Sequence, residues 1–113
     1  MKLVQEIRGD VAILRPSGQL MGGAEGDAVR DSIPVLLQQG YRKILIDLQD
    51  VSWVNSTGLG ILISGHLAAS GQGGKLNLMR VSPRIESILG VTRLDTVFQV
   101  FGDEESALKS FGL

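Results

Sequence analysis

The sequence feature that most constrains the fold is a continuous apolar run at residues 43–48, Lys-Ile-Leu-Ile-Asp-Leu. A strand with one face in water alternates apolar and polar residues, whereas a strand buried on both faces is apolar almost throughout. The run also follows a segment with helical spacing of apolar residues, which ends at Gly40. We therefore expect residues 43–48 to form a buried strand in the middle of a sheet.

Two shorter apolar-rich runs precede this strand, at residues 3–8 and 11–17. Gly9 and Asp10 separate them, and this pair favours a tight turn between antiparallel strands. A β-hairpin is therefore predicted at the N-terminal end. Residues 18–23, Gly-Gln-Leu-Met-Gly-Gly, then break the strand pattern.

The first helix is predicted from about Ala24 to Gly40, because apolar residues recur there near helical spacing. Pro34 lies inside this segment and lacks the amide hydrogen that a helix interior uses. Two outcomes are compatible with it. Either the helix bends at Pro34, or it begins late, with Ser32 as its cap and Pro34 in its first turn.

The rest of the chain continues to alternate helices with strands, separated by glycine-containing turns. The predicted elements are a helix at 56–70, a strand at 75–81, a helix at 82–90, a strand at 97–101 and a helix from 104 onward. The resulting order, ββαβαβαβα, predicts an α/β fold with a central mixed sheet of about five strands and about four helices. A single domain is expected over residues 1–113.

Composition and charge fit one globular domain and exclude several kinds of partner. The chain has 113 residues, 43% hydrophobic and 20% charged, with a net charge of -1. Such a balanced charge predicts no attraction to nucleic acid or to an anionic membrane surface. With no apolar signal segment and no run near ~18 apolar residues, we expect no membrane insertion and, by default, a cytoplasmic location.

No catalytic constellation is predicted. The chain has no cysteine and one histidine, which excludes thiol chemistry and a Cys/His zinc site within one chain. Ser56 and His66 fall on one predicted helix, about 15 Å apart at ~1.5 Å rise per residue, so they cannot form a nucleophile–base pair. The carboxylates of Asp47, Asp50 and Glu86 are expected to form turns or to be solvated, since nothing in the pattern pairs them.

Cofactor motifs are also missing. Gly58 and Gly60 open a helix after an apolar segment, but Ile63 stands where a dinucleotide fingerprint needs its third glycine. The glycine-rich residues 22–26 lack the Lys-Ser/Thr of a phosphate-binding loop, and they are predicted to be a flexible loop. We therefore expect no cofactor and no metal, while nucleotide binding stays open.

The start of the second predicted helix carries a cluster of small polar residues, Asn55, Ser56 and Thr57, followed by Gly58 and Gly60. Side chains of this type accept hydrogen bonds from the free amides at a helix N-terminus and stabilise it by about 1 kcal/mol. Capping alone therefore explains the cluster as well as a functional role does.

Residues 46–60, Ile-Asp-Leu-Gln-Asp-Val-Ser-Trp-Val-Asn-Ser-Thr-Gly-Leu-Gly, resemble the signature of the STAS domain family, in its anti-sigma factor antagonist branch. The resemblance extends over nearly the whole chain. Residues 18–20 are similar to the family's Gly-x-Leu turn, and residues 82–108 to its C-terminal third. The predicted element order and the chain length agree with that family.

The resemblance implies a binding switch and not an enzyme. In this family the serine at the position of Ser56 is phosphorylated by a partner that is both an anti-sigma factor and a serine kinase. The unphosphorylated form binds that partner and frees the sigma factor, and a phosphatase restores it. By this resemblance Ser56 is the phosphorylation site, and the partner contacts Asn55, Ser56, Thr57, Gly58 and Gly60. The two glycines either let the partner approach the backbone or serve helix packing.

Two positions differ from the family's pattern and keep a second function in view. Asn55 replaces a common aspartate before the serine, and Met21 replaces an acidic residue after Gly-x-Leu. Recognition by a kinase is thus left open, with Thr57 as another hydroxyl that either caps the helix or accepts phosphate. The alternative is a STAS subunit that does not switch, a structural adaptor in a lipid-transport, anion-transport or signalling assembly. The oligomeric state, including a weak homodimer, is not fixed by the sequence.

Overall fold

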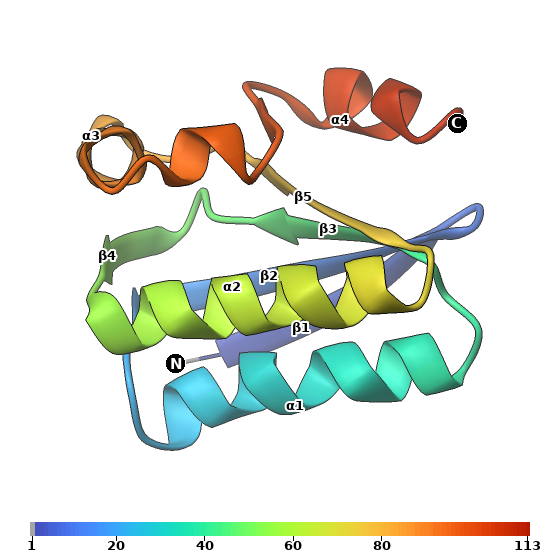
Figure 1. Cartoon of the computed structure of the whole chain (residues 1–113), viewed down its shortest axis with the longest axis horizontal. Helices are drawn as coiled ribbons and strands as arrows, with labels where there is room; N and C mark the ends of the chain where they lie inside the picture. The colour runs from blue at the N-terminus through green and yellow to red at the C-terminus, as the bar shows by residue number, and fades with distance from the viewer. Residues whose placement is uncertain (1) are drawn as a thin grey trace.

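The computed structural model describes residues 2–113, apart from the side chains of Lys2 and Glu25, and it contains one mixed sheet (Figure 1). Its strands are β1 (Lys2–Arg8), β2 (Val11–Leu20), β3 (Lys43–Asp47), β4 (Val51–Val54), β5 (Lys75–Met79) and β6 (Val100–Phe101). They follow the order β1-β2-β3-β5-β6, and β4 pairs with the end of β2. Only the β1–β2 hairpin is antiparallel, which confirms the predicted turn at Gly9 and Asp10.

Helices cover both faces of the sheet. They are α1 (Ala24–Gln38), α2 (Ser56–Gly71), α3 (Pro83–Val91) and α4 (Glu104–Ser110), with a 3-10 turn, η1, at Leu94–Thr96. Figure 1 shows α1 and α2 side by side on one face, with α4 on the other. The larger apolar core lies under α1 and α2, and a smaller one lies under α4. The predicted α/β fold is confirmed.

Strand β3 holds the middle of the sheet, as the apolar run predicts. It pairs in parallel with β2 on one side and β5 on the other. Ile44 and Ile46 belong to the core under α1 and α2, whereas Leu45 belongs to the core under α4. All three side chains are fully buried, because successive residues of a strand point to opposite faces and here both faces are covered.

One strand was not predicted, so the sheet has six strands and not about five. Strand β4 pairs in parallel with the last residues of β2, where the register shifts between Gly18 and Gln19. Gly18 has a φ of 105°, which lets β2 pass this irregularity and continue to Leu20. The prediction that the strand pattern ends before Gly18 was therefore wrong.

Helix α1 runs through Pro34 and begins well before it. Ser32 is no cap, since its hydroxyl donates to the carbonyl of Ala28 at 2.7 Å within the helix. The late-start alternative was therefore wrong. Pro34 is exposed, whereas its neighbour Ile33 is buried in the core, so packing of the inner face holds the helix despite the missing amide hydrogen.

The last strand is shorter than the predicted 97–101. A 3-10 turn at 94–96 precedes it, and only Val100 and Phe101 pair with β5. Phe98 is not part of the strand, because its ring is buried in the main core, with 3% of its surface exposed. The prediction was wrong for residues 97–99.

The N-terminal end of α2 lies directly on the end of β2. A Cβ atom on Gly58 would overlap the carbonyl oxygen of Leu20 and would lie 2.9 Å from a methyl group of Val54. Gly58 is accordingly buried. By contrast, a Cβ on Gly60 would meet no heavy atom within 4 Å. Of the two glycines, Gly58 is the one that helix packing requires.

Replacing these two glycines should therefore have opposite effects. Gly58→Ala is expected to lower the free energy of unfolding by about 1–3 kcal/mol, because the added methyl group forces α2 away from the sheet. Gly60→Ala, the matched control on the same helix, should raise it by up to about 1 kcal/mol through helix propensity. Urea denaturation of both variants measures this. Equal effects would show that close packing at Gly58 does not govern stability.

A buried carboxylate connects β3 with β2, with the residue that follows β5 and, through Arg15, with α4. Asp47, 5% exposed, accepts hydrogen bonds from Arg15 Nη1 at 2.9 Å and from Arg80 Nη2 at 2.8 Å and Nε at 3.2 Å. It also accepts from the backbone amide of Gln49 at 3.0 Å. Arg15 Nη2 also donates a hydrogen bond to Glu104 Oε1 at 2.7 Å. The sequence-based expectation that Asp47 is a turn former or a solvated charge was therefore incomplete.

Burial and ion pairing act on Asp47 in opposite directions. Burial raises the pKa of Asp47, but the hydrogen bonds from Arg80, the Gln49 amide and Arg15 outweigh it and hold the pKa below its ordinary value. The carboxylate is therefore ionised at neutral pH, as a charge paired with two guanidinium groups needs to be.

Removing this charge should destabilise the fold in a pH-dependent way. Asp47→Asn is expected to lower the free energy of unfolding by about 1–3 kcal/mol at pH 7. Because the folded-state pKa is lowered, the stabilisation is complete above the unfolded pKa of about 3.9 and is lost as the pH falls through the folded value. Urea denaturation from pH 7 to pH 3 should show the difference between the two proteins begin to shrink as the pH falls below about 4.

The exposed Asp50 provides the control. Asp50→Asn should change the unfolding free energy by no more than about 0.5 kcal/mol at any of these pH values, as is usual for surface substitutions. A difference between wild type and Asp47→Asn that stayed constant down to pH 3 would contradict the role given to the ionised carboxylate.

Candidate functional site

The candidate site is the N-terminal end of α2, which strand β4 delivers to the surface. Asn55 has extended backbone angles, φ -97° and ψ -174°, and caps the helix: its Oδ1 accepts a hydrogen bond from the Gly58 amide at 2.8 Å. Its carbonyl accepts from the Leu59 amide at 2.9 Å, and its own amide donates to the Leu20 carbonyl at 3.4 Å. Helix capping, one of the two explanations of the polar cluster, is therefore real for Asn55.

Ser56 is the first residue of α2 and is exposed. Thr57 is also exposed, and the loop after β2 borders it, since a Cβ on Gly22 would lie 3.5 Å from the Thr57 methyl group. Gly60 is exposed on the same side of the helix as Ser56, four residues further on. We call Asn55, Ser56, Thr57 and Gly60 the α2-start surface. Neither hydroxyl is needed for the cap, so the modification and contact roles given to them remain predictions.

Gly58 differs from the other four residues that the resemblance associates with partner contact. It is buried between Leu20 and Val54, so the structure supports the packing explanation for it. A partner that contacts the α2-start surface would reach Asn55, Ser56, Thr57 and Gly60 before it reached Gly58.

An aromatic–cation pair lies next to this surface. The guanidinium carbon of Arg84, at the start of α3, lies 4.3 Å from the centre of the Trp53 ring in β4. Such stacking is worth about 0.5–1 kcal/mol at an exposed site. No sequence pattern predicts this pair, because the two residues are far apart along the chain.

His66 lies on α2 with Ser56, as predicted, and takes no part in the site. Its ring meets Phe98 edge-on, with 5.6 Å between the ring centres. Its Nδ1 is buried without a hydrogen-bond partner in the described part of the chain. Within the same residues, no group of His, Asp and Glu side chains is arranged to hold a metal ion.

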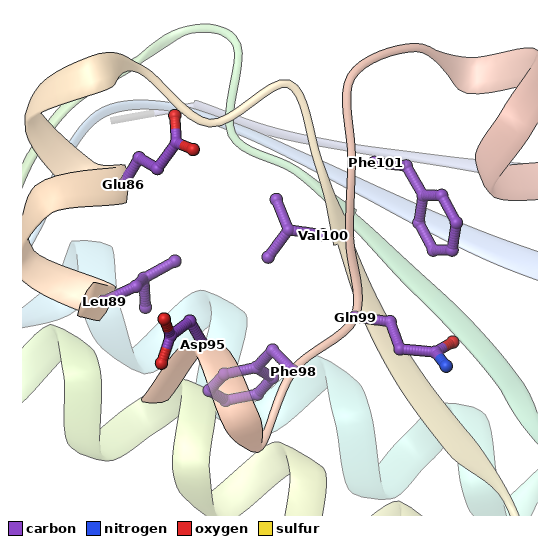
Figure 2. Close-up of a pocket in the computed structure, with 7 residues that line it drawn as sticks. All are labelled: Glu86, Leu89, Asp95, Phe98, Gln99, Val100 and Phe101. Carbon is purple, nitrogen blue, oxygen red and sulfur yellow. The ribbon is translucent and has the colours of Figure 1, made fainter. Parts of the chain in front are cut away.

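One cavity shares no residue with the α2-start surface. It has a volume of about 470 Å³ and lies between α3, η1 and β6 (Figure 2). Its lining residues are Glu86, Leu89, Asp95, Phe98, Gln99, Val100 and Phe101. None of these belongs to β4 or α2. Across residues 2–113, no helix combines the length and apolar character that crossing a membrane requires.

Known proteins match this chain over most of its length. Residues 2–107 match the family model described as the STAS domain. The anti-sigma-B factor antagonist of Bacillus subtilis is 30% identical over 81 residues, which are 72% of this chain and 73% of that protein. A Thermotoga neapolitana homologue of an assigned anti-sigma factor antagonist is 30% identical over 100 residues, 88% of each chain.

The fold matches solved structures of such proteins as well. The crystal structure of a Thermotoga maritima protein, assigned as an anti-sigma factor antagonist, superposes with a TM-score of 0.88 at 26% identity. The match covers 96% of this chain and 92% of that one. The family match over most of the sequence, the relatives and the fold agree: the chain belongs to the STAS domain family.

Proposed function

We propose that this chain is an anti-sigma factor antagonist that changes partners through Ser56. In its unphosphorylated form it binds a cognate anti-sigma factor that is also a serine kinase. Phosphorylation of Ser56 releases that partner, and a phosphatase restores binding. The chain itself catalyses nothing in this scheme, and it acts in the cytoplasm, where sigma factors are found.

The observation that carries the proposal is the exposed Ser56 hydroxyl at the first position of a helix whose cap is made by another residue. The names of the relatives support the choice of partner class. Since Asn55 supplies the cap, a phosphate on Ser56 removes no hydrogen bond that holds α2 in place. The modification therefore alters the charge of the surface and leaves the fold unchanged.

Charge then explains how binding is switched. The α2-start surface contains no ionisable side chain, so its unphosphorylated form is neutral. A phosphate brings about -1.5 to -2 charges at neutral pH, and at an interface this charge has to be paired or suffers desolvation and repulsion. Each ~1.4 kcal/mol of such a cost weakens binding tenfold.

The proposal predicts how substitutions of Ser56 change partner binding. Tagged wild-type protein, Ser56→Ala and Ser56→Glu would be used for affinity capture from cells that produce this protein, with mass spectrometry of the captured proteins and of Ser56. Ser56→Ala should retain an anti-sigma factor with serine kinase sequence, and Ser56→Glu should lose it. Part of the wild-type protein should carry phosphate on Ser56.

Ser64→Glu is the matched control, because Ser64 is exposed on the same helix beyond its first turns. It should capture the same partner as wild type. If all baits instead held the same transporter or scaffold subunits, with Ser56 unmodified, the chain would be a structural adaptor and the switch would be refuted.

The helix end should also tolerate negative charge on Ser56 without unfolding. Ser56→Glu is expected to raise the free energy of unfolding by about 0.3–1 kcal/mol at low salt, because an anion is favourable at a helix N-terminus. Ser70→Glu, near the C-terminal end of α2, should have the opposite sign.

Urea denaturation at low and at high salt measures both effects, and salt should reduce them. A loss of more than about 1 kcal/mol in Ser56→Glu would mean that phosphate acts by unfolding α2 and not through the interface.

A further inference from the structure

The cavity between α3, η1 and β6 is part of a longer groove. A second cavity, of about 240 Å³, shares Glu86, Val100 and Phe101 with the first and continues to Arg80, Val81 and Gly102. We call the residues Glu86, Leu89, Asp95, Phe98, Val100 and Phe101 the α3–β6 groove. The α2-start surface contributes none of them, and on α3 Glu86 is about 200° around the helix from Arg84.

The groove combines an apolar base with two carboxylates from separate elements. Leu89 and Phe98 are almost fully buried at its base, while Val100 is 38% exposed. Figure 2 shows Glu86 extending from α3 toward Val100, and Asp95 below Leu89 on η1. Both acidic side chains are exposed.

Neither carboxylate is neutralised by the protein. No basic side chain described in residues 2–113 forms an ion pair with Glu86 or Asp95. Arg80, which lines the second cavity, is committed to Asp47 at 2.8 Å and also approaches Glu104 at 3.6 Å. The groove therefore presents uncompensated negative charge over an apolar base, which is complementary to a cationic group on an apolar body.

The free edge of the sheet borders the same groove. β6 is the last strand in the sheet order. The carbonyls of Gln99 and Phe101 accept hydrogen bonds from the β5 side, from the Leu78 amide at 3.0 Å and the Arg80 amide at 2.8 Å. Backbone groups of successive strand residues point in opposite directions, so the amide and carbonyl of Val100 face away from β5. Residues 2–113 provide no strand on that side.

We propose that the α3–β6 groove is a docking site for an extended segment of a partner protein, in which an arginine or lysine shares one face with apolar residues two positions before and after it. The segment adds to β6 through the backbone of Val100, places its basic side chain between Glu86 and Asp95, and packs its apolar side chains against the exposed side chain of Val100. Strand addition of this kind takes affinity from backbone hydrogen bonds and specificity from side-chain pockets.

The same features disfavour a second copy of this chain as the occupant. A symmetric pairing of two β6 edges would bring two acidic grooves together, and like charges that face each other destabilise such pairing. The outward backbone of Val100 also suits an extended polypeptide better than a small cation. The site is independent of Ser56 and of the switch proposed for it.

The test is a titration of the 15N-labelled full chain, followed by amide NMR shifts, with a synthetic peptide, acetyl-Thr-Val-Thr-Arg-Thr-Val-Gly-amide, whose arginine and two valines share one face of a strand. Shifts are expected at Val100 and around Glu86 and Leu89, with Ser56 and Thr57 unmoved. A peptide with glutamate in place of the arginine should not bind. A peptide with proline in place of both threonines beside the arginine should bind more weakly, since proline lacks the amide hydrogen of a strand residue and fixes φ away from strand values.

Variants of the protein test how much the charge of each carboxylate contributes to peptide binding. Glu86→Gln and Asp95→Asn should each weaken the arginine peptide about two- to fivefold, the range of an exposed ion pair. Glu105→Gln, an exposed acid on α4 outside the groove, and Ser56→Glu should leave its affinity unchanged.

Three results would overturn the proposal. The first is no shift at Val100 with the arginine peptide. The second is equal binding of the glutamate peptide, or of the arginine peptide to the Glu86→Gln and Asp95→Asn variants. The third is an arginine amide that reproduces all the shifts on its own, since the groove would then be a small-cation site without strand addition.

Discussion

The close approach of α2 to the end of β2 at Gly58 determines much of this domain. Because Gly58 has no side chain, the helix backbone packs against the carbonyl of Leu20, and β4, which pairs with the end of β2, leads directly into the helix. Asn55 can then cap the helix while it also bonds to Leu20. The exposure of Ser56 follows from this arrangement, because the next residue after such a cap has no core to enter. The packing of α2 and the exposure of Ser56 thus depend on the same contact.

Sequence periodicity predicted the elements that are long or strongly apolar. β3, the hairpin and the later helices were found because their own residues carry the pattern and the turns between them contain glycine. β4 was not found, since it has four residues and its pairing partner, the end of β2, is distant in the sequence. α1 continues past Pro34 because packing of its inner face outweighs a local penalty, and such a balance is invisible in the sequence alone.

The site could be predicted only in part, for a similar reason. The resemblance directed attention to Ser56, and helix-cap chemistry explained its neighbours. The ion cluster around Asp47 was missed because Arg15 lies on β2 and Arg80 directly follows β5, and a strand-end aspartate on its own indicates a turn. The stacking of Arg84 on Trp53 was missed likewise. Interactions between elements distant in sequence depend on the assembled sheet, and no local pattern encodes them.

The close packing of the α2 N-terminus against the end of β2 has a consequence for any enzyme that modifies Ser56. The hydroxyl is presented by a formed helix end, so the backbone around it cannot be drawn into an extended conformation without losing the Asn55 cap. The neighbouring surface combines the loop at Gly22, the helix residue Thr57 and the ring of Trp53 beneath Arg84. Such an enzyme would have to read a folded epitope, and a linear peptide of the same sequence would carry little of what it recognises.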